Sequence, residues 1–388
     1  MPAQNNSDLA LVRGTIYASP RDEPIRNGTV LIHDGKIARV GAAITAPPGV
    51  PSIDCSGLTI AAGFWNSHVH FFERKWANAA DIPAEELGRQ LREMLTRYGF
   101  TSVFDLSSPW ENTRKIRDRV NSGEVPGPRI RSTGMGLLPK DPGLPGEAVM
   151  NFMGVMKTAR SEVADAEQAG AAARELLDGG VDGIKLFISA PSKTRIPESA
   201  MEAAVKEARR AGKPVFVHPN SGADVMAAVQ AGVDVIGHTT PFSGPWDGTL
   251  VKAMAERGVA LTPTLTIWKY YMRHDRASVQ EKTTETEIGQ LRAWIAAGGT
   301  VLFGTDLGAI DPDPSEEYAL MRQAGMSFRQ ILASLTIAPA ERFGESGRLG
   351  QVAEGLAADL AVFRGESLTD VAYTLRDGKI IYRATHTH

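Results

Sequence analysis

The chain has 388 residues, of which 43% are hydrophobic and 22% charged, a composition typical of folded globular proteins and unlike that of disordered ones. Its 42 Lys and Arg against 45 Asp and Glu leave a formal charge of −3, so nucleic acid is not an expected partner. A single cysteine, Cys55, excludes an intramolecular disulfide, and no stretch approaches the roughly 20 apolar residues that span a bilayer. We therefore expect a cytoplasmic protein with no membrane partner.

Both ends of the chain are predicted to form short β-strands. Residues 9–18 and 28–40 are rich in β-branched residues, and the pairs Asn27-Gly28 and Asp34-Gly35 are typical of hairpin turns. Near the C-terminus, three more strands are predicted over residues 358–363, 371–375 and 379–382. Asp377-Gly378 is the expected turn between the last two.

Between these ends, short apolar runs alternate with segments of helical periodicity, a pattern typical of βα units and a parallel sheet. Eight strands are predicted, the first after residues 58–63 and the others over residues 102–106, 129–133, 183–188, 215–217, 233–237, 259–264 and 300–304. Amphipathic helices are predicted over residues 168–177, 200–211, 223–230 and 288–297. Eight such units close naturally into an α/β fold of the (β/α)8 TIM barrel type, with an open doubly wound sheet as the alternative.

Polar residues lie where a barrel keeps its chemistry, at the C-terminal ends of strands. His68 and His70 flank Val69, so an extended strand points both imidazoles to one side, an arrangement that binds metal ions. His218, His238 and Asp306 each end a predicted strand. Taken one at a time, a histidine there is more often a hydrogen-bonded core residue, and the aspartate can cap a helix.

Lys185 lies inside the apolar run of residues 183–188. A lysine that is removed from water loses its proton more readily, and the free amine can add carbon dioxide to form a carbamate whose two oxygens can bridge two cations. A lysine that reaches solvent is the simpler interpretation for this residue alone. Together, however, the six residues fall on strands one, four, five, six and eight, so all of them can converge at one barrel mouth.

These residues resemble the amidohydrolase superfamily of metal-dependent hydrolases over essentially the whole chain. The matching segments are residues 28–37, 63–70, 237–238, 304–306, 355–360 and 377–379. Within the superfamily the chain is similar to the branch of imidazolonepropionase and of metal-dependent Xaa-Pro dipeptidases, which residues 261–265 also fit. His218-Pro219-Asn220 departs from that branch, in which a small residue usually follows the strand-five histidine.

The resemblance implies two divalent ions, with zinc as the default metal. His68, His70 and Asp306 would hold one ion, His218 and His238 the other, and a carbamate on Lys185 would bridge them. It also implies a small β-sandwich built from residues 1–58 and 350–388, beside a barrel of residues 59–349.

The expected reaction is hydrolysis of an amide C–N bond in a small molecule, such as a dipeptide or an N-acyl amino acid. A metal-bridging hydroxide would attack the carbonyl carbon, and Asp306 would carry the water's proton to the departing nitrogen. Lys185 and Asp306 are thus the predicted catalytic residues.

For the substrate, we expect contacts from Arg195 and Tyr270, because a cation or a phenol can hold a carboxylate. The aromatic residues around Tyr270 favour an apolar or aromatic group in the substrate. A deaminase or cyclic amidohydrolase of the same fold is an alternative, although Lys185 argues against a one-metal deaminase. Lactonase or esterase activity at the same site also remains open, whereas a metal-free scaffold has no reason to retain six ligands. A homo-oligomer is expected.

Overall fold

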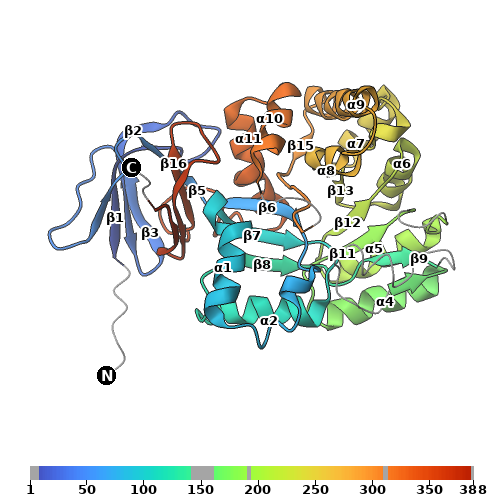
Figure 1. The fold of residues 1–388 in the computed structure, drawn as a ribbon, viewed down its shortest axis with the longest axis horizontal. Coiled ribbons are helices and arrows are strands. Elements are labelled where there is room, and N and C mark those ends of the chain that lie inside the picture. Colours follow the sequence, from blue (N-terminus) through green and yellow to red (C-terminus); the bar gives the residue numbers. More distant parts are fainter. Residues whose placement is uncertain (1–7, 141–160, 190–193, 309–312, 386–388) are drawn as a thin grey trace.

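The computed structural model describes residues 8–140, 161–189, 194–308 and 313–385, so the outermost residues of the expected sandwich lie outside the described part. Its fold is mixed α/β. Figure 1 shows two parts side by side: strands from both ends of the chain form one of them, and parallel strands surrounded by helices form the other.

The terminal strands form one mixed sheet. Its members are β1 (Leu9–Ile16), β2 (Ile25–His33), β3 (Lys36–Gly41), β4 (Ser52–Asp54), β5 (Leu58–Ala62), β16 (Leu360–Arg364), β17 (Val371–Arg376) and β18 (Lys379–Arg383). The order is β18-β17-β16-β5-β1-β2-β3, with β4 beside β1. The antiparallel pair β5 and β16, in which Ile60 faces Val362, joins the two ends of the chain. A separate buried apolar cluster, which includes Leu11, Ile32 and Leu375, packs within this sheet.

Two of the three predicted hairpin turns are confirmed. Asp34-Gly35 connects β2 to β3 and Asp377-Gly378 connects β17 to β18, and all four residues have the positive φ that such turns need. The prediction for Asn27-Gly28 is wrong, because this pair lies inside β2. Asn27 has φ 49°, and the ladder between β1 and β2 shifts register on both sides of Gly14, which faces Gly28. The pair therefore marks an irregularity within a strand that continues beyond it.

The eight predicted parallel strands are present. They are β6 (Phe64–Val69), β7 (Phe100–Asp105), β8 (Arg129–Ser132), β11 (Ile184–Phe187), β12 (Val215–His218), β13 (Val235–Gly237), β14 (Ala260–Thr262) and β15 (Thr300–Val301). Two short strands that the sequence did not indicate, β9 (Leu137–Pro139) and β10 (Ser161–Val163), lie between the third and the fourth. Hydrogen bonds join the strands in the orders β6-β7-β8 and β10-β9-β11-β12-β13-β14-β15.

Backbone hydrogen bonds also connect these two parallel sheets. Ser67 N donates to Phe303 O at 2.7 Å, which sets β6 beside the segment that follows β15. At the other junction, Asp182 N donates to Ser132 O at 2.7 Å, which sets the start of β11 beside β8. One buried cluster collects the side chains Trp65, Phe104, Phe216, Val235 and Ala260 from five of the strands. These contacts are consistent with the predicted barrel, because strands arranged around a common interior share one core.

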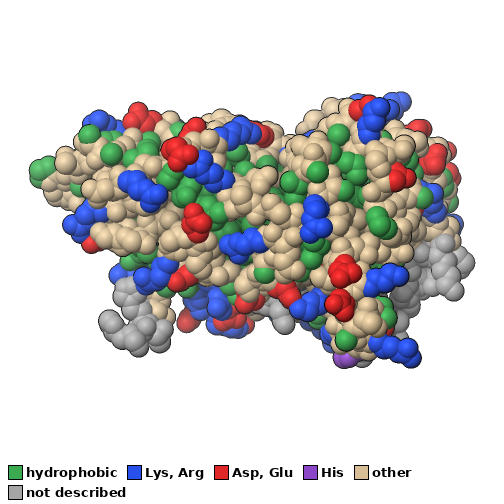
Figure 2. Space-filling view, turned by 90° about the horizontal axis from the view of Figure 1, so that it is seen from above, with side chains coloured by type: hydrophobic (Ala, Val, Ile, Leu, Met, Phe, Trp, Pro, Cys, Tyr) green, Lys and Arg blue, Asp and Glu red, His purple; other side chains and the backbone are tan. Residues whose placement is uncertain are grey.

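Helices cover the outside of the parallel strands (Figure 1). They are α1 (Ala84–Met94), α2 (Trp110–Asn121), α4 (Ala166–Asp178), α5 (Glu198–Arg210), α6 (Gly222–Ala231), α7 (Gly248–Glu256), α8 (Leu265–Tyr271), α9 (Ala277–Ala296), α10 (Ser315–Gln323), α11 (Phe328–Leu335) and α12 (Ile337–Arg342). The four helices predicted from periodicity correspond to α4, α5, α6 and α9. Within the described residues, no helix has the length and apolar character that crossing a membrane needs. Figure 2 shows acidic and basic side chains intermixed over the face seen from above.

Candidate metal centre

His68 and His70 stand at the end of β6 with Asp306 between their ring nitrogens. The alternation of side chains along the strand puts both imidazoles on one side, with ring centroids 5.3 Å apart. Asp306 Oδ1 lies 2.6 Å from His70 Nε2 and 3.4 Å from His68 Nε2. All three side chains are buried, and each offers one ligand atom within 4.8 Å of the others. Their geometry can hold one metal ion.

His218 and His238 extend the same group of imidazoles. His218 is the last residue of β12 and His238 follows β13, and these neighbouring strands pair in parallel, so their C-terminal ends lie together. The two ring centroids are 4.5 Å apart, and the ring of His238 lies 4.7 Å from that of His68. The four imidazoles therefore form one continuous cluster.

Lys185 brings an amine to this cluster from β11. Its side chain is 1% exposed and its Nζ has no hydrogen-bond partner in the described structure. A Cβ atom placed on Gly237 would lie 3.4 Å from Lys185 Nζ and 3.3 Å from His68 Cε1, so the amine and the imidazole meet over this glycine. Burial lowers the pKa of Lys185 to about 7, against the opposing effect of the Asp306 charge. Much of the lysine is therefore a free, nucleophilic amine at neutral pH.

Burial also sets the protonation states of the other groups. It lowers the pKa of His68 and His238 well below the ordinary value, and that of His218 to about 4. For Asp306, burial acts to raise the pKa, but His68 and His70 outweigh it and hold the pKa well below its usual range. The result is neutral rings at His68, His218 and His238 and an ionised carboxylate at Asp306, the states in which these side chains bind metal ions.

Two of the six residues have strained backbones. His238 has φ 77° and Asp306 has φ 61°, in the left-handed region that residues with a Cβ rarely adopt. Each such residue costs about 1–3 kcal/mol, and strain of this kind persists mainly at functional sites. His238 directly follows β13, and Asp306 lies in the segment after β15, where Asp306 N donates to His68 O at 2.8 Å.

The residues His68, His70 and Asp306 fit a divalent metal ion. Imidazole nitrogens and a carboxylate oxygen are donors that zinc accepts. A buried amine without a partner is otherwise hard to explain, because polar groups in protein interiors are normally hydrogen-bonded.

Comparison with known proteins assigns the family, because residues 59–382 match the amidohydrolase family. The chain belongs to this family. This amidohydrolase is 25% identical over 401 residues to the ochratoxinase of Aspergillus niger, a match that covers 92% of the chain and 82% of the relative. It is 31% identical over 125 residues to the imidazolonepropionase of Thermoplasma acidophilum, covering 31% of the chain and 27% of the relative.

Solved structures share this fold. A Xaa-Pro dipeptidase with bound methionine superposes with a TM-score of 0.81 at 23% identity, over 97% of this chain and 100% of that one. A prolidase complexed with N-methylphosphonate-L-proline has a TM-score of 0.78 at 26% identity, over 97% and 100%. The predicted family is thus confirmed, and the amidohydrolase is an enzyme that acts on C–N bonds.

The sequence did not single out several residues that hold the ligands of this amidohydrolase. Thr264 Oγ1 lies 2.6 Å from His238 Nδ1. Asn66 donates to Thr305 Oγ1 at 2.8 Å and accepts from His68 N at 3.2 Å, so it ties β6 to the loop that carries Asp306. The position of Thr264 at the end of a predicted strand is the one local signal that could have pointed to it.

Asp105 organises the turn that follows His70. It lies at the end of β7, fully buried, and accepts hydrogen bonds from Phe71 N at 3.3 Å and from Ser132 Oγ at 2.6 Å, as well as from Ser108. Because Phe71 follows His70 directly, this network fixes the backbone that presents the imidazole. Asn220, in the segment His218-Pro219-Asn220 that departs from the branch, donates from its side-chain amide to Ser189 Oγ at 2.8 Å.

Both predicted substrate residues already have partners within the protein. Arg195 Nε is 3.2 Å from Asp224 Oδ1, and its Nη2 donates to Ala223 O at 3.0 Å. The ring of Tyr270 lies 4.1 Å from the guanidinium carbon of Arg273. A carboxylate bound by Arg195 would have to share the guanidinium with Asp224. Both assignments stay predictions.

An aromatic rim, formed by Phe242, Trp268 and Tyr271, adjoins the cluster. Ring centroids are 5.3 Å apart for Phe242 and Trp268, and 6.3 Å for Trp268 and Tyr271, while Trp268 lies 6.1 Å from His238. Phe242 is 63% exposed and Tyr271 52%, which is unusual for large apolar side chains. Partial burial, followed by the charge of Asp306, raises the pKa of Tyr271.

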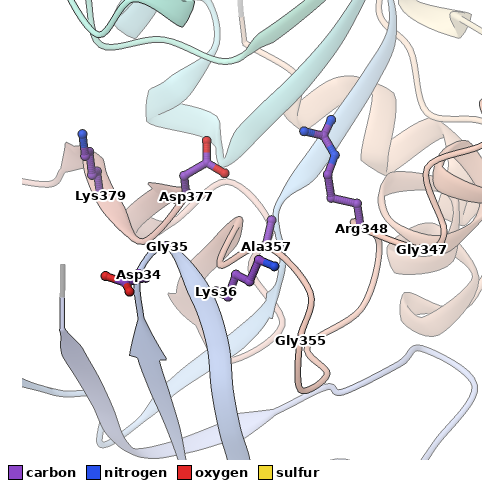
Figure 3. A pocket seen from close by; sticks show the side chains of 9 residues that line it. All are labelled: Asp34, Gly35, Lys36, Gly347, Arg348, Gly355, Ala357, Asp377 and Lys379. Atoms are coloured by element: carbon purple, nitrogen blue, oxygen red, sulfur yellow. The ribbon is translucent and has the colours of Figure 1, made fainter.

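A hollow elsewhere in the molecule lacks this chemistry. It has a volume of about 620 Å³ and lies beside the turns of the terminal sheet (Figure 3). Its lining consists of Asp34, Gly35, Lys36, Gly347, Arg348, Gly355, Ala357, Asp377 and Lys379. The six predicted ligands are all absent from this lining, so the hollow is separate from the candidate metal centre.

Proposed function

We propose that this amidohydrolase hydrolyses the amide C–N bond of a dipeptide, an N-acyl amino acid or a related amide at a binuclear zinc centre. The observation that carries the proposal is the buried, unpartnered amine of Lys185 beside four imidazoles and a carboxylate. His68, His70 and Asp306 would hold one ion, and His218 and His238 the other.

The amine becomes a ligand by reaction with carbon dioxide. Lys185 Nζ attacks the carbon of CO2: a C–N bond forms, one C=O π bond opens with its electron pair going to oxygen, and the nitrogen releases one proton to solvent to give a carbamate. The carbamate keeps the nitrogen and adds a negatively charged group with two oxygens that can bind metal ions. Such a group would be an anionic ligand for divalent ions, whereas Nζ has no hydrogen-bond partner among the described residues.

When bound by these residues, divalent ions would lower the pKa of a water to about 7 and polarise the substrate carbonyl. Asp306 begins ionised, since the neighbouring imidazoles keep its pKa low, and it accepts the proton of the attacking water on a carboxylate oxygen. It then delivers this proton to the departing nitrogen, so that a carboxylic acid and an amine leave. Thr264 and Asn66 keep the ligands oriented during this exchange.

The rim favours a substrate with an apolar or aromatic portion. Phe242 and Tyr271 expose their rings on either side of Trp268, which contacts His238, and an apolar group can stack there and exclude water. The prolidase relative was solved with an N-methylphosphonate-L-proline ligand, which supports an amide of an amino acid. The carboxylate of that amino acid would be held by Arg195 or Tyr270.

The two parts of the fold can also be assigned to residue ranges. We infer a closed (β/α)8 barrel over residues 59–349 and a composite β-sandwich from residues 1–58 and 350–388. The cross-sheet hydrogen bonds and the shared interior cluster support the barrel. A homo-oligomer in the cytoplasm remains our prediction.

A substrate screen tests the function. Zinc-loaded protein is offered dipeptides, N-acyl amino acids, lactones, simple esters and cyclic amidines, with detection of released amine, acid and ammonia. We expect amide hydrolysis that Asp306→Asn abolishes and that Asp178→Asn, the same change at an exposed position of α4, leaves intact. Turnover of esters alone, or ammonia release from a ring with one metal per chain, would overturn the proposal.

A further inference from the structure

Helix α8 begins with a residue that does not cap it. Thr264 occupies the capping position, where a threonine usually accepts a hydrogen bond from a backbone N–H of the first turn. Here its φ is 44°, and its side chain makes no capping hydrogen bond. The hydroxyl instead lies 2.6 Å from Nδ1 of His238. With this left-handed backbone, the Thr264 side chain contacts His238 and not the first turn of the helix.

Glu317, from α10, caps α8 in place of Thr264. One carboxylate oxygen of Glu317 accepts from Leu265 N at 2.9 Å. The other accepts from Thr266 N and from Thr266 Oγ1, each at 2.9 Å. Glu317 is fully buried, so these contacts are sheltered from water. The backbone N–H groups that Thr264 leaves unsatisfied are thus bound from another helix.

We propose that Glu317 is a positioning residue of the metal centre: by capping α8 from α10, it frees the Thr264 hydroxyl to orient His238. The inference rests on the proposed function, in which His238 is a ligand. A hydrogen bond at Nδ1 fixes the ring and leaves Nε2 available, and outer groups of this kind tune metal affinity in other proteins.

The surroundings of Glu317 argue against a purely stabilising role. Glu287, from α9, is also fully buried, and both of its carboxyl oxygens lack a hydrogen-bond partner in the described structure. Burial, followed by the charge of Glu317, raises the pKa of Glu287 well above its usual value. Two acids placed together in the interior are unfavourable for folding. A self-capping threonine would avoid this arrangement, but it would release His238.

The test compares two glutamates on the same helix. Glu317→Ala removes the buried cap, and Glu317→Gln keeps one acceptor oxygen in the same volume. Glu316→Gln is the matched control, because the neighbouring Glu316 is exposed and pairs with Lys269 of the same helix α8. Thermal melting first establishes that each protein is folded.

The first readout is zinc affinity, measured by competition with a chelator in the metal-free protein. We expect Glu317→Ala to weaken binding of one ion by about 10- to 100-fold and Glu317→Gln less, with Glu316→Gln unchanged. Thr264→Val should weaken zinc binding as much as Glu317→Ala does. Thr264→Ser keeps the hydroxyl and should bind zinc as tightly as the wild type. The double variant of Glu317→Ala and Thr264→Val should be no worse than either alone, because both act on one contact.

The second readout is a crystal structure of metal-free Glu317→Ala. We expect the Thr264 hydroxyl to turn to the N–H groups of α8 and to lose its contact with His238. Wild-type zinc affinity in Glu317→Ala, additive losses in the double variant, or an unmoved Thr264 hydroxyl would overturn the inference. A wild-type protein that binds no zinc would instead refute the proposed function, while the Thr264 rotamer would still decide the inference.

Discussion

Asp306 and His70 meet at 2.6 Å between Oδ1 and Nε2, and the backbone around them is joined as well. Asp306 N donates to His68 O at 2.8 Å, and His70 N donates to Leu307 O at 2.7 Å. The first parallel strand and the segment after the last one are therefore held in register where the ligands stand. The hydrogen bonds that join the first and last parallel segments therefore also position three of the predicted metal ligands.

Asp306→Asn tests the proton transfer. The amide keeps the size of the side chain and one oxygen donor, but it cannot accept and return a proton. We expect kcat to fall by about 100-fold or more with zinc still bound, as measured by steady-state kinetics and elemental analysis. Wild-type kcat in the folded, zinc-containing variant would refute the role of Asp306.

Lys185→Met tests the carbamate. Methionine has similar volume without the buried amine, so the metal-free protein should melt no lower than wild type. The zinc content should fall below two per chain and amide hydrolysis should be lost. Lys206→Met, at an exposed position of α5, is the control for the change of residue type. A Lys185→Met protein with full zinc content and activity would show that no carbamate is needed.

Glu317 predicts a dependence of stability on pH. Burial raises its pKa from 4.5 to about 7, so between these values the folded chain binds more protons than the unfolded chain. The stabilisation from this group is complete below pH 4.5 and is lost as pH rises to about 7. We expect the free energy of unfolding of wild type, relative to Glu317→Gln, to fall by about 3 kcal/mol over this window.

Urea denaturation at several pH values measures this difference. The buried histidines titrate in both proteins and cancel in the comparison. A constant difference between wild type and Glu317→Gln from pH 4.5 to 8 would contradict the assignment of a buried, titrating carboxylate.

Arg129 connects the parallel strands to the terminal sheet. Its Nε and Nη2 bind the two oxygens of Asp359 at 2.9 and 3.1 Å, and Asp359 is 3% exposed. Arg129→Met leaves that carboxylate buried without its partner, which should cost about 3–5 kcal/mol. Arg364→Met breaks an exposed pair with Asp370 and should cost about 1 kcal/mol or less. Equal losses in urea denaturation would show that the buried pair has no special role.

Periodicity and turn residues were enough to predict the parallel strands and the ends at which the six polar residues lie. The reason is physical: each strand is a short apolar run, and the catalytic face of such a fold lies where these runs end. Asn27-Gly28 misled because the same positive φ that makes a turn also makes an irregularity within a strand. Tertiary pairing across Gly14 decides between the two, and local sequence does not contain it.

The residues that orient the predicted ligands could not be predicted from the sequence for a related reason. Glu317 meets Thr266 through the packing of α10 against α8, and nothing in either segment alone indicates that contact. The protonation states of His68 and Lys185 likewise depend on burial, which sequence pattern predicts only as apolar surroundings. The exposed ring of Phe242 became informative only once it was seen beside Trp268.

A crystal structure of the protein grown with zinc and bicarbonate tests the central claim most directly. The account predicts two ions among the four imidazoles and Asp306, with density that continues beyond Lys185 Nζ as a carboxylate reaching both ions. A bare amine at Lys185, with no ion near it and the imidazoles hydrogen-bonded to one another or to water, would contradict it.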